Sequence, residues 1–429
     1  MIKKTILFIL IIHYFCISSN VLFARNIPKK IILNNMSYIY HANEDSKITV
    51  LQIAFYGGSS IEPAELKGIS QIASRMFIQV SGSDNIKDIV SKNSVCYIRI
   101  KSNYIIITIE SLSEYFDDAV KIFFKTIRKP DITGMRLNFL KKRMVQMQGN
   151  LKENYNYVLN EAIRKHYFKG TGYEGSIYGN TESLKNIKKK SISNFHKKTI
   201  NLSNMILSIS TDLKEDIVTK ILKKNLKKFP IGEKQSFKNV ILKNTENNTI
   251  TKKIKGDLYT IAYSFLVRFN ESLSRKEFIY GKMLETYLGK GIGSYLWTLR
   301  AKEDLTYSIN SKIVFFKPFG YLYFFIKTDK ENIDKTLNIY KTLIDSLNKG
   351  IDEKTFNSII AYTTTSFQRQ NEMKRALSYN LIFFEVLGLG YDFYANFTKE
   401  IKSISLIEFN KYLQRILAPS NRLSIIIGD

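Results

Sequence analysis

Cysteine is scarce in this chain, which has only Cys16 and Cys96 among its 429 residues. Cys16 lies in an N-terminal segment that we expect to be removed, which leaves one cysteine and no intramolecular disulfide in the mature chain. A protein exported without a disulfide depends on its hydrophobic core for stability. Cys96 lies in an apolar, strand-like run, a pattern typical of a buried core side chain rather than a nucleophile.

Motifs of several enzyme classes are also missing. No G-x-S-x-G stretch appears, which excludes the nucleophile elbow of an α/β-hydrolase, and Cys96 has no histidine companion in its sequence context. Gly289, Gly291 and Gly293 lack the G-x-G-x-x-G spacing, so the sequence predicts no nucleotide site. Since paired carboxylates are not conspicuous either, a hydrolase of some other chemistry is the weakest interpretation.

Acidic residues are few beside the basic ones. The chain has 65 Lys and Arg against 38 Asp and Glu, a net charge of +27. Such a surplus can indicate a nucleic acid or an acidic surface as partner. The lysines are spread along the whole chain among many Ile, Asn and Tyr residues, as a compositional bias leaves them, and no nucleic-acid-binding motif accompanies them. We therefore expect no nucleic acid partner.

The N-terminus has the order of a signal peptide. Lys3 and Lys4 precede an apolar run that begins at Ile6, and Ala24 offers a cleavage point. The sequence therefore predicts a signal peptide over residues 1–24 and a mature protein that is periplasmic or otherwise exported, with only transient membrane passage. The alternative is an uncleaved signal anchor that tethers the chain to the inner membrane.

The chain repeats itself at long range. "NMILSISTD" ends at Asp212 and "NRLSIIIGD" ends at Asp429, an offset of 217 positions. The same offset places "EYFDDAVKIFF" on "ENIDKTLNIYK", and each half gives strands, a helix, a hairpin, more helices and a closing strand. Strands and helices without strict alternation favour an α+β fold. We expect two tandem homologous domains, each a mostly antiparallel sheet covered on one face by helices. The predicted parts are an N-terminal domain over 25–231, a linker over 232–253 and a C-terminal domain over 254–429.

One predicted helix, "GISQIASRMF", has the polar spacing of a metal site without its ligands. Its apolar residues form one stripe, and Gln71, Ser74 and Arg75 lie at i, i+3 and i+4 on the other face. This is the spacing with which a zinc peptidase presents two histidines and a glutamate.

From about Ile32 to Asp429 the sequence resembles the insulinase/pitrilysin family of zinc peptidases, which includes the mitochondrial processing peptidases. The resemblance rests on the order of "LNNMSYIY", "AFYGGSSIEPAELKGIS", "YGNTESLKNI", "LRAKEDLTYSINS" and "SIIIGD". It implies two α+β domains that face each other across a cleft. Active members carry H-x-x-E-H, whose histidines hold zinc and whose glutamate is the general base, and a glutamate on a later helix completes the ligands.

This chain departs from that pattern at the motif. The five positions read Gln71-Ile72-Ala73-Ser74-Arg75, and neither Gln nor Ser is a good zinc ligand, while Arg keeps its proton. The later glutamate is expected near Met147, and the nearest acid is Glu153. The four histidines, His13, His41, His166 and His196, stand apart in the sequence. We therefore expect no catalytic residues, no metal and no cofactor in this chain, and zinc only in a partner subunit.

The second half keeps one feature of the family. In "LRAKEDLTYS", Arg300 and Tyr307 match the Arg and Tyr that reach toward substrate in family members, so the resemblance implies a substrate-binding role. A guanidinium and a phenol are suitable donors to a developing oxyanion. The alternative is that Arg300 forms an ordinary ion pair with Glu303 or Asp304 and that Tyr307 fills the core.

Two functions fit these observations. In the first, the chain is an exported, zinc-less subunit that binds peptide substrate and forms a heterodimer with a zinc-bearing family member in proteolysis, as some family members do. It is then inactive alone. In the second, it is a stand-alone peptide-binding or scaffold protein without a proteolytic role, in which Arg75 anchors an acidic group.

Overall fold

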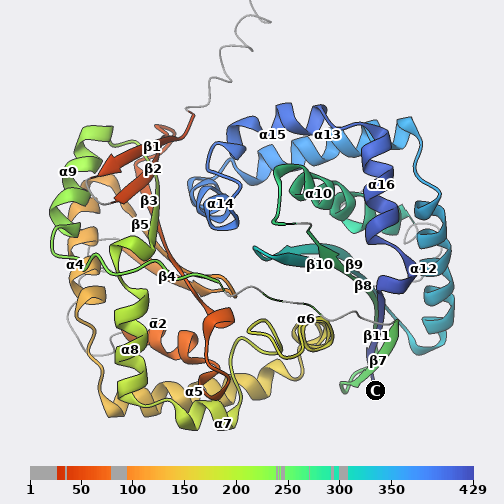
Figure 1. The fold of residues 1–429 in the computed structure, drawn as a ribbon, viewed down its shortest axis with the longest axis horizontal. Coiled ribbons are helices and arrows are strands. Elements are labelled where there is room, and N and C mark those ends of the chain that lie inside the picture. Colours follow the sequence, from red (N-terminus) through yellow and green to blue (C-terminus); the bar gives the residue numbers. More distant parts are fainter. Residues whose placement is uncertain are drawn as a thin grey trace, which may run out of the picture.

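The structure is a computed structural model that describes residues 27–33, 36–78, 94–237, 240, 242, 247–269, 271–290, 294–298 and 308–429. It has two halves, each built on one sheet, that lie side by side (Figure 1). The predicted signal peptide, Arg300 and Tyr307 lie outside the described residues.

The first sheet is six-stranded, in the order β1-β2-β6-β3-β5-β4. Neighbours pair antiparallel except β2 and β6, which are parallel. β4 and β5 form the predicted hairpin, with Ser102 and Asn103 in the turn. The strand bounds are β1 Lys29–Leu33, β2 Met36–Ala42, β3 Ile48–Tyr56, β4 Ser94–Ile100, β5 Tyr104–Leu112 and β6 Met205–Thr211.

The second sheet is five-stranded, in the order β7-β11-β8-β10-β9, and only β7 and β11 are parallel. β8 and β10 are buried along nearly their whole length, as their apolar sequences predict for central strands. The strand bounds are β7 Asn248–Lys253, β8 Tyr259–Arg268, β9 Ser308–Phe315, β10 Phe319–Thr328 and β11 Arg422–Gly428. The predicted α+β fold of two sheets packed with helices is confirmed.

Each half also has helices, and most of them cover the outer face of its sheet (Figure 1). In the first half they are α2 Ile69–Ile78, α4 Phe116–Arg128, α5 Gly134–Leu151, α6 Tyr155–Tyr167, α7 Thr181–Asn186, α8 Lys189–Thr199 and α9 Glu215–Leu226. In the second half they are α10 Arg275–Gly289, α12 Ile333–Asn348, α13 Glu353–Gln370, α14 Lys374–Leu387, α15 Phe393–Lys402 and α16 Leu406–Ile416.

The internal repeat appears in the structure with the predicted offset. β6 and β11 have the same bounds when shifted by 217 positions, as do α8 and α16. The repeated asparagines have the same role: Asn204 Nδ2 donates to Tyr56 O at 2.8 Å and to Thr199 O at 2.9 Å. Asn421 Nδ2 donates to Leu266 O at 2.6 Å and to Ile416 O at 3.1 Å. Each asparagine thereby joins the end of a helix to a central strand.

One helix of each half packs on the inner face of the other half's sheet. The apolar face of α14 contacts β3 and β6, and α6 contacts β8 and β11. Figure 1 shows both helices in the middle of the molecule, between the sheets. They are repeat counterparts, so the two halves exchange equivalent helices. This exchange was not predicted, and it makes the core of each half depend on the other.

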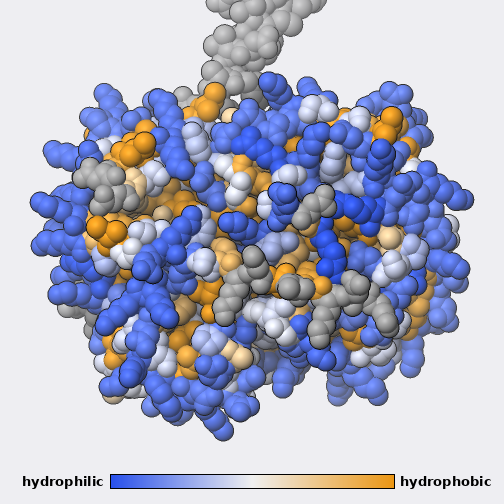
Figure 2. Space-filling view, viewed as in Figure 1, coloured by the Kyte–Doolittle hydropathy of each residue, from blue (hydrophilic) through white to orange (hydrophobic). Residues whose placement is uncertain are grey.

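The predicted linker, residues 232–253, includes β7 at its end, which pairs with β11. The domain boundaries themselves stay a prediction. Hydrophilic residues cover most of the face seen in Figure 2, with hydrophobic residues showing between them. Among the residues described, no helix combines the length and apolar character that crossing a membrane needs.

Candidate functional site

The helix with the metal-site spacing, α2, is held at its start by a buried carboxylate. The N–H groups of Gly68 and Ser70 donate to Glu62 at 2.9 and 2.8 Å. Such bonds satisfy donors that a helix N-terminus leaves without intrahelical partners. Burial raises the pKa of Glu62, and the hydrogen bonds from Ser70 and Gly68 oppose that shift. Glu62 therefore fixes where α2 begins.

The three motif positions have different environments. Gln71 and Ser74 are buried, and the Ser74 Oγ has no hydrogen-bond partner in the described parts of the chain. Arg75 is half-buried and lines a cavity. Its Nη1 donates to the Gln71 carbonyl oxygen at 3.0 Å and to the Gln71 side-chain oxygen. The two positions that hold zinc in active relatives are therefore joined to each other by hydrogen bonds.

These residues do not fit zinc. Gln71 presents an amide oxygen already bound by Arg75, and a guanidinium repels a divalent cation. Met147, where the later glutamate is expected, lines the same cavity with a thioether, and Glu153 lies beyond the end of α5. Within the described residues, no group of three or more His, Cys, Asp or Glu side chains is placed to share a metal.

The described histidines lie on different elements and make separate contacts. His41 Nδ1 lies 2.9 Å from Ser210 Oγ, between β2 and β6. His196 Nε2 lies 2.7 Å from Ile127 O, and its ring packs edge-on against Phe77. Burial lowers the pKa of His196, with the Ile127 bond opposing this, and burial also lowers that of His166. The fold therefore favours their neutral forms.

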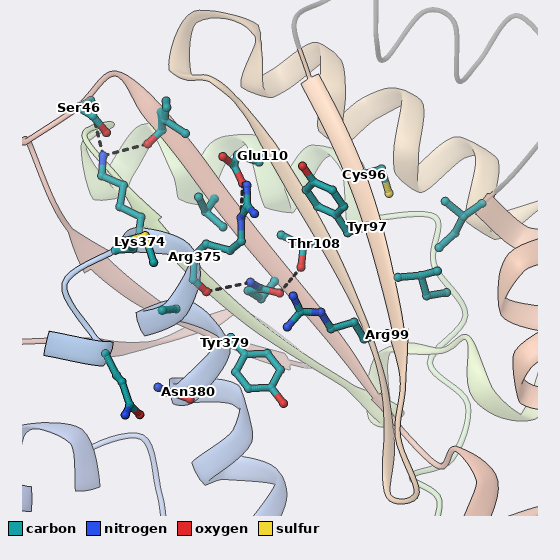
Figure 3. A pocket seen from close by; sticks show the side chains of 18 of the residues that line it. Ser46, Cys96, Tyr97, Arg99, Thr108, Glu110, Lys374, Arg375, Tyr379 and Asn380 are labelled. Carbon is teal, nitrogen blue, oxygen red and sulfur yellow. Dashed lines mark hydrogen bonds and ion pairs between the residues drawn. The ribbon is translucent and has the colours of Figure 1, made fainter. Parts of the chain in front are cut away.

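A cavity of about 1170 Å³ surrounds β4, the edge strand of the first sheet (Figure 3). Residues of α2 and α5 line it together with residues from the start of α14 in the other half. β4 pairs only with β5 in the described part of the chain. Alternate N–H and C=O groups on its outer edge therefore have no strand partner among the described residues. The cavity is thus a cleft between the halves with an open strand edge in it.

Hydrogen bonds from α14 hold the cleft wall against the first sheet. Thr108 Oγ1 donates to Gln52 Oε1 at 2.6 Å, and Gln52 Nε2 donates to Arg375 O at 3.2 Å. Arg375 Nε donates to Glu110 at 2.6 Å (Figure 3). Lys374, which is 8% exposed, donates from Nζ to two backbone oxygens of the first half, Ser46 O at 2.8 Å and Ile48 O at 2.9 Å. Since these bonds bridge the halves, the width of the cleft is set by the fold.

Aromatic and cationic side chains lie together on this wall. The Arg375 guanidinium lies 4.9 Å from the Tyr97 ring centroid, and that of Arg99 lies 5.9 Å from the Tyr379 centroid. The hydroxyls of Tyr104 and Tyr379 are 2.6 Å apart, and burial raises the pKa of both. This wall therefore combines aromatic faces with cationic and hydroxyl donors in fixed positions.

Cys96 lines the cleft on the β4 side that faces the helices. Burial raises the pKa of its thiol to about 12, so it is protonated at neutral pH. A protonated thiol is a poor nucleophile. Cys96 is half-buried at the cleft, not enclosed in the core as its apolar sequence context predicts.

The structure adds cleft residues that the sequence did not single out, chiefly Tyr97, Arg99, Lys374 and Arg375. The alternation of β4, with Tyr97 and Arg99 among apolar residues, was an available signal of a strand with one polar face. Nothing in the sequence placed residues 374 and 375 beside it, because that contact depends on the helix exchange.

Comparisons with known proteins agree with this geometry. Residues 186–363 match the model of a family described as "Peptidase M16 inactive domain". A curated relative from Helicobacter pylori (strain ATCC 700392 / 26695), "Non-peptidase homolog YmxG", is 22% identical over an alignment of 396 residues, which covers 88% of this chain and 88% of that protein.

Solved structures share the fold over almost the whole chain. The peptidase M16 inactive domain from Pseudomonas fluorescens superposes with a TM-score of 0.85 at 15% identity, over 94% of this chain and 97% of that one. A chain of complex III2 from Candida albicans gives a TM-score of 0.78 at 14% identity, over 93% and 95% of the two chains. At these identities the likeness concerns the fold alone.

Proposed function

Since this chain belongs to the M16 peptidase family, the insulinase/pitrilysin family that its sequence resembles, we propose that it binds peptides without cutting them and supports a zinc-bearing family member. It is an inactive homologue in that family, and its motif helix carries no residue set that fits zinc. The proposed role is therefore one that needs no zinc in this chain.

One observation carries the proposal: the cleft is intact although the hydrolytic groups are replaced. The open edge of β4 lies in a cavity of about 1170 Å³, beside the helix that holds zinc in active relatives. An extended peptide can add to such an edge through main-chain hydrogen bonds, while pockets receive alternate side chains. The bridging bonds of Lys374 and Arg375 keep this cleft formed without substrate.

A catalytic partner supplies the hydrolysis in this proposal. The fold is shared with a chain of complex III2, an assembly of several subunits, so this architecture is compatible with stable complexes. In this proposal the chain and its partner are periplasmic or otherwise exported, which the predicted signal peptide over residues 1–24 supports. Arg300 and Tyr307 would then act on the peptide that the partner cuts.

The test is a pull-down of the tagged full-length chain from the source cell, followed by a peptidase assay of the recovered partner with and without this chain. We expect a zinc-bearing family member in the eluate and hydrolysis by the mixture that a zinc chelator abolishes. The chain alone should be inactive. Stoichiometric zinc in the purified chain, or robust cleavage by it alone, contradicts the proposal.

Arg300→Ala and Tyr307→Ala test the assigned substrate contacts in the same mixture. Loss of one oxyanion donor should lower the activity about ten-fold or more. Arg369→Ala, an exposed arginine on α13, is the matched control and should leave the activity unchanged. If both test variants keep full activity, the assigned roles are wrong.

The second candidate is a stand-alone peptide-binding protein. It is favoured by the fact that this chain supplies two walls of the cleft, from α2 and α5 of the first half and from the start of α14 of the second half. A gene for a zinc-motif relative beside this one favours the first proposal, and peptide binding with no partner recovered favours the second.

A further inference from the structure

The cleft around β4 carries more cationic groups than its own carboxylates neutralise. Five basic side chains line it: Arg75, Arg99, Arg143, Lys374 and Arg375. Its lining carboxylates are Asp45, Glu110 and Glu372. Arg375 is paired with Glu110, and Lys374 has two backbone oxygens and the nearby charges of Asp212 and Asp45. Arg75, Arg99 and Arg143 have no carboxylate partner in the parts of the chain that the structure describes.

Arg75 is the most constrained of these three. Its Nη1 is held by both oxygens of Gln71, while Nε and Nη2 have no protein partner within the described residues. Gln71 is 2% exposed, so it fixes the guanidinium from a buried position. The fixed fork leaves two parallel donors for a ligand, the geometry that a carboxylate accepts.

The surroundings of Arg75 favour an anion. Burial lowers its pKa, Tyr178 acts in the opposite direction, and the positive charge of Arg143 lowers it again. An arginine stays charged in proteins, so a cation placed in this way is destabilised until a counter-charge arrives. A bound carboxylate would remove this strain for Arg75 and Arg143 together, which metal binding cannot do.

We propose that the bound peptide places a carboxylate on the Arg75 guanidinium, with Arg143 as the second cation, so that the cleft selects acidic peptides. This inference rests on the proposed function, in which the peptide lies along β4. The carboxylate is either an Asp or Glu side chain or the peptide's own C-terminus. The helix position that binds zinc in active relatives is thereby a substrate anchor in this chain.

The experiment measures the affinity of the full chain for four fluorescent peptides of seven residues, the length of β4. The first is uncharged, with acetylated and amidated ends. The second has a central glutamate, the third has a free C-terminus instead, and the fourth has a central lysine. We expect the second or the third to bind about ten-fold more tightly than the first, and the fourth to bind more weakly.

Three variants assign that gain to one guanidinium. Arg75→Gln should abolish the gain, which is measured for each variant against that variant's own affinity for the uncharged peptide. Arg75→Lys keeps the charge without the fork and should keep part of the gain. Arg128→Gln, at the end of α4 and outside the cleft, is the matched control and should keep all of it. Circular dichroism checks that each variant is folded.

The outcomes separate this inference from the function beneath it. If the uncharged peptide binds but neither carboxylate improves binding, the anchor is refuted and peptide binding stands. If the gain survives in Arg75→Gln, another cation is responsible and the proposal is wrong. If no peptide binds at all, both proposals fail. A gain with the glutamate peptide alone identifies a side-chain carboxylate, and a gain with the free terminus alone identifies a C-terminal one.

Discussion

Because the halves exchange helices, a cavity made at the end of α6 should destabilise the sheet of the other half. Phe168, directly after α6, is fully buried against the second sheet. Its ring stacks on Phe319 with centroids 4.6 Å apart, and Phe316 and Tyr173 close around it at 5.7 and 6.3 Å. The neighbouring Tyr167 hydroxyl donates to Ser264 O at 2.8 Å. The Phe168→Ala variant removes the centre of this contact.

The expected cost follows from the burial and the rigidity of the site. Replacing a buried phenylalanine with alanine destabilises proteins by about 3–5 kcal/mol, from lost transfer energy and the cavity left behind. The upper part of that range applies here, because the surrounding rings come from two halves and cannot easily close the gap. Since domains are stable by about 5–15 kcal/mol, the loss is a large fraction of the total.

Urea denaturation followed by two probes tests this prediction. Far-ultraviolet circular dichroism reports the whole chain, and the single tryptophan, Trp297, reports the second half. Although Phe168 belongs to the first half, the urea midpoints of both probes should fall together. The two transitions should give the same loss in the free energy of unfolding. Phe139→Ala is the control, since Phe139 is 58% exposed on α5 and should change stability by no more than about 0.5 kcal/mol. An unmoved Trp297 transition beside a shifted dichroism signal would refute the coupling of the halves.

Three further predictions concern single side chains. Burial lowers the pKa of His196, so its neutral form stabilises the fold above the ordinary value of 6.5, and that stability is lost as the pH falls through the lowered pKa. His196→Gln keeps a donor for Ile127 O, so its midpoint in urea should fall less between pH 7 and pH 5 than that of the parent; equal slopes would contradict this. Asn204→Ala should lower the free energy of unfolding by about 1–3 kcal/mol, because it leaves two backbone carbonyls without the asparagine donor. Asn421→Ala should lower it by a similar amount. A change under about 0.5 kcal/mol in either variant would contradict the shared role. Burial raises the pKa of the Cys96 thiol to about 12, so alkylation at pH 8 in a Cys16-free chain should be slow until urea unfolds it; rapid labelling of the folded chain would show that the thiol is not protected.

The sequence predicts much of the fold because that part is written in local patterns. The β4–β5 hairpin follows from two alternating apolar runs with Ser102 and Asn103 between them. The repeat is visible in the sequence because each half has an asparagine, Asn204 or Asn421, just before its closing strand. In the structure these two side chains make equivalent hydrogen bonds. The helix exchange has no local signal, since α6 and α14 look like other amphipathic helices whichever sheet they cover.

The candidate site was only partly predictable, for the same reason. The i, i+4 spacing of Gln71 and Arg75 on one helix allows the contact that the structure shows. The sequence also predicted that their donor atoms do not fit zinc. It gave no sign that Ser74 is buried, nor that Arg75 opens into a cleft whose opposite wall begins at residue 374. Those facts depend on packing between residues far apart in the chain.

The helix exchange also accounts for how a cleft can persist without catalytic groups. The wall that α14 forms is fixed by apolar packing on β3 and by the Lys374 and Arg375 bonds, none of which involves the motif positions. In the other half, α6 packs on the inner face of the second sheet in the same manner. The cleft's shape is therefore set by the two-half architecture, while Gln71 and Arg75 decide only the charge at one point of its lining. In the proposed function, a guanidinium in place of the metal keeps a positive charge beside the peptide and removes the activated water, so that the same fold holds a peptide without cutting it.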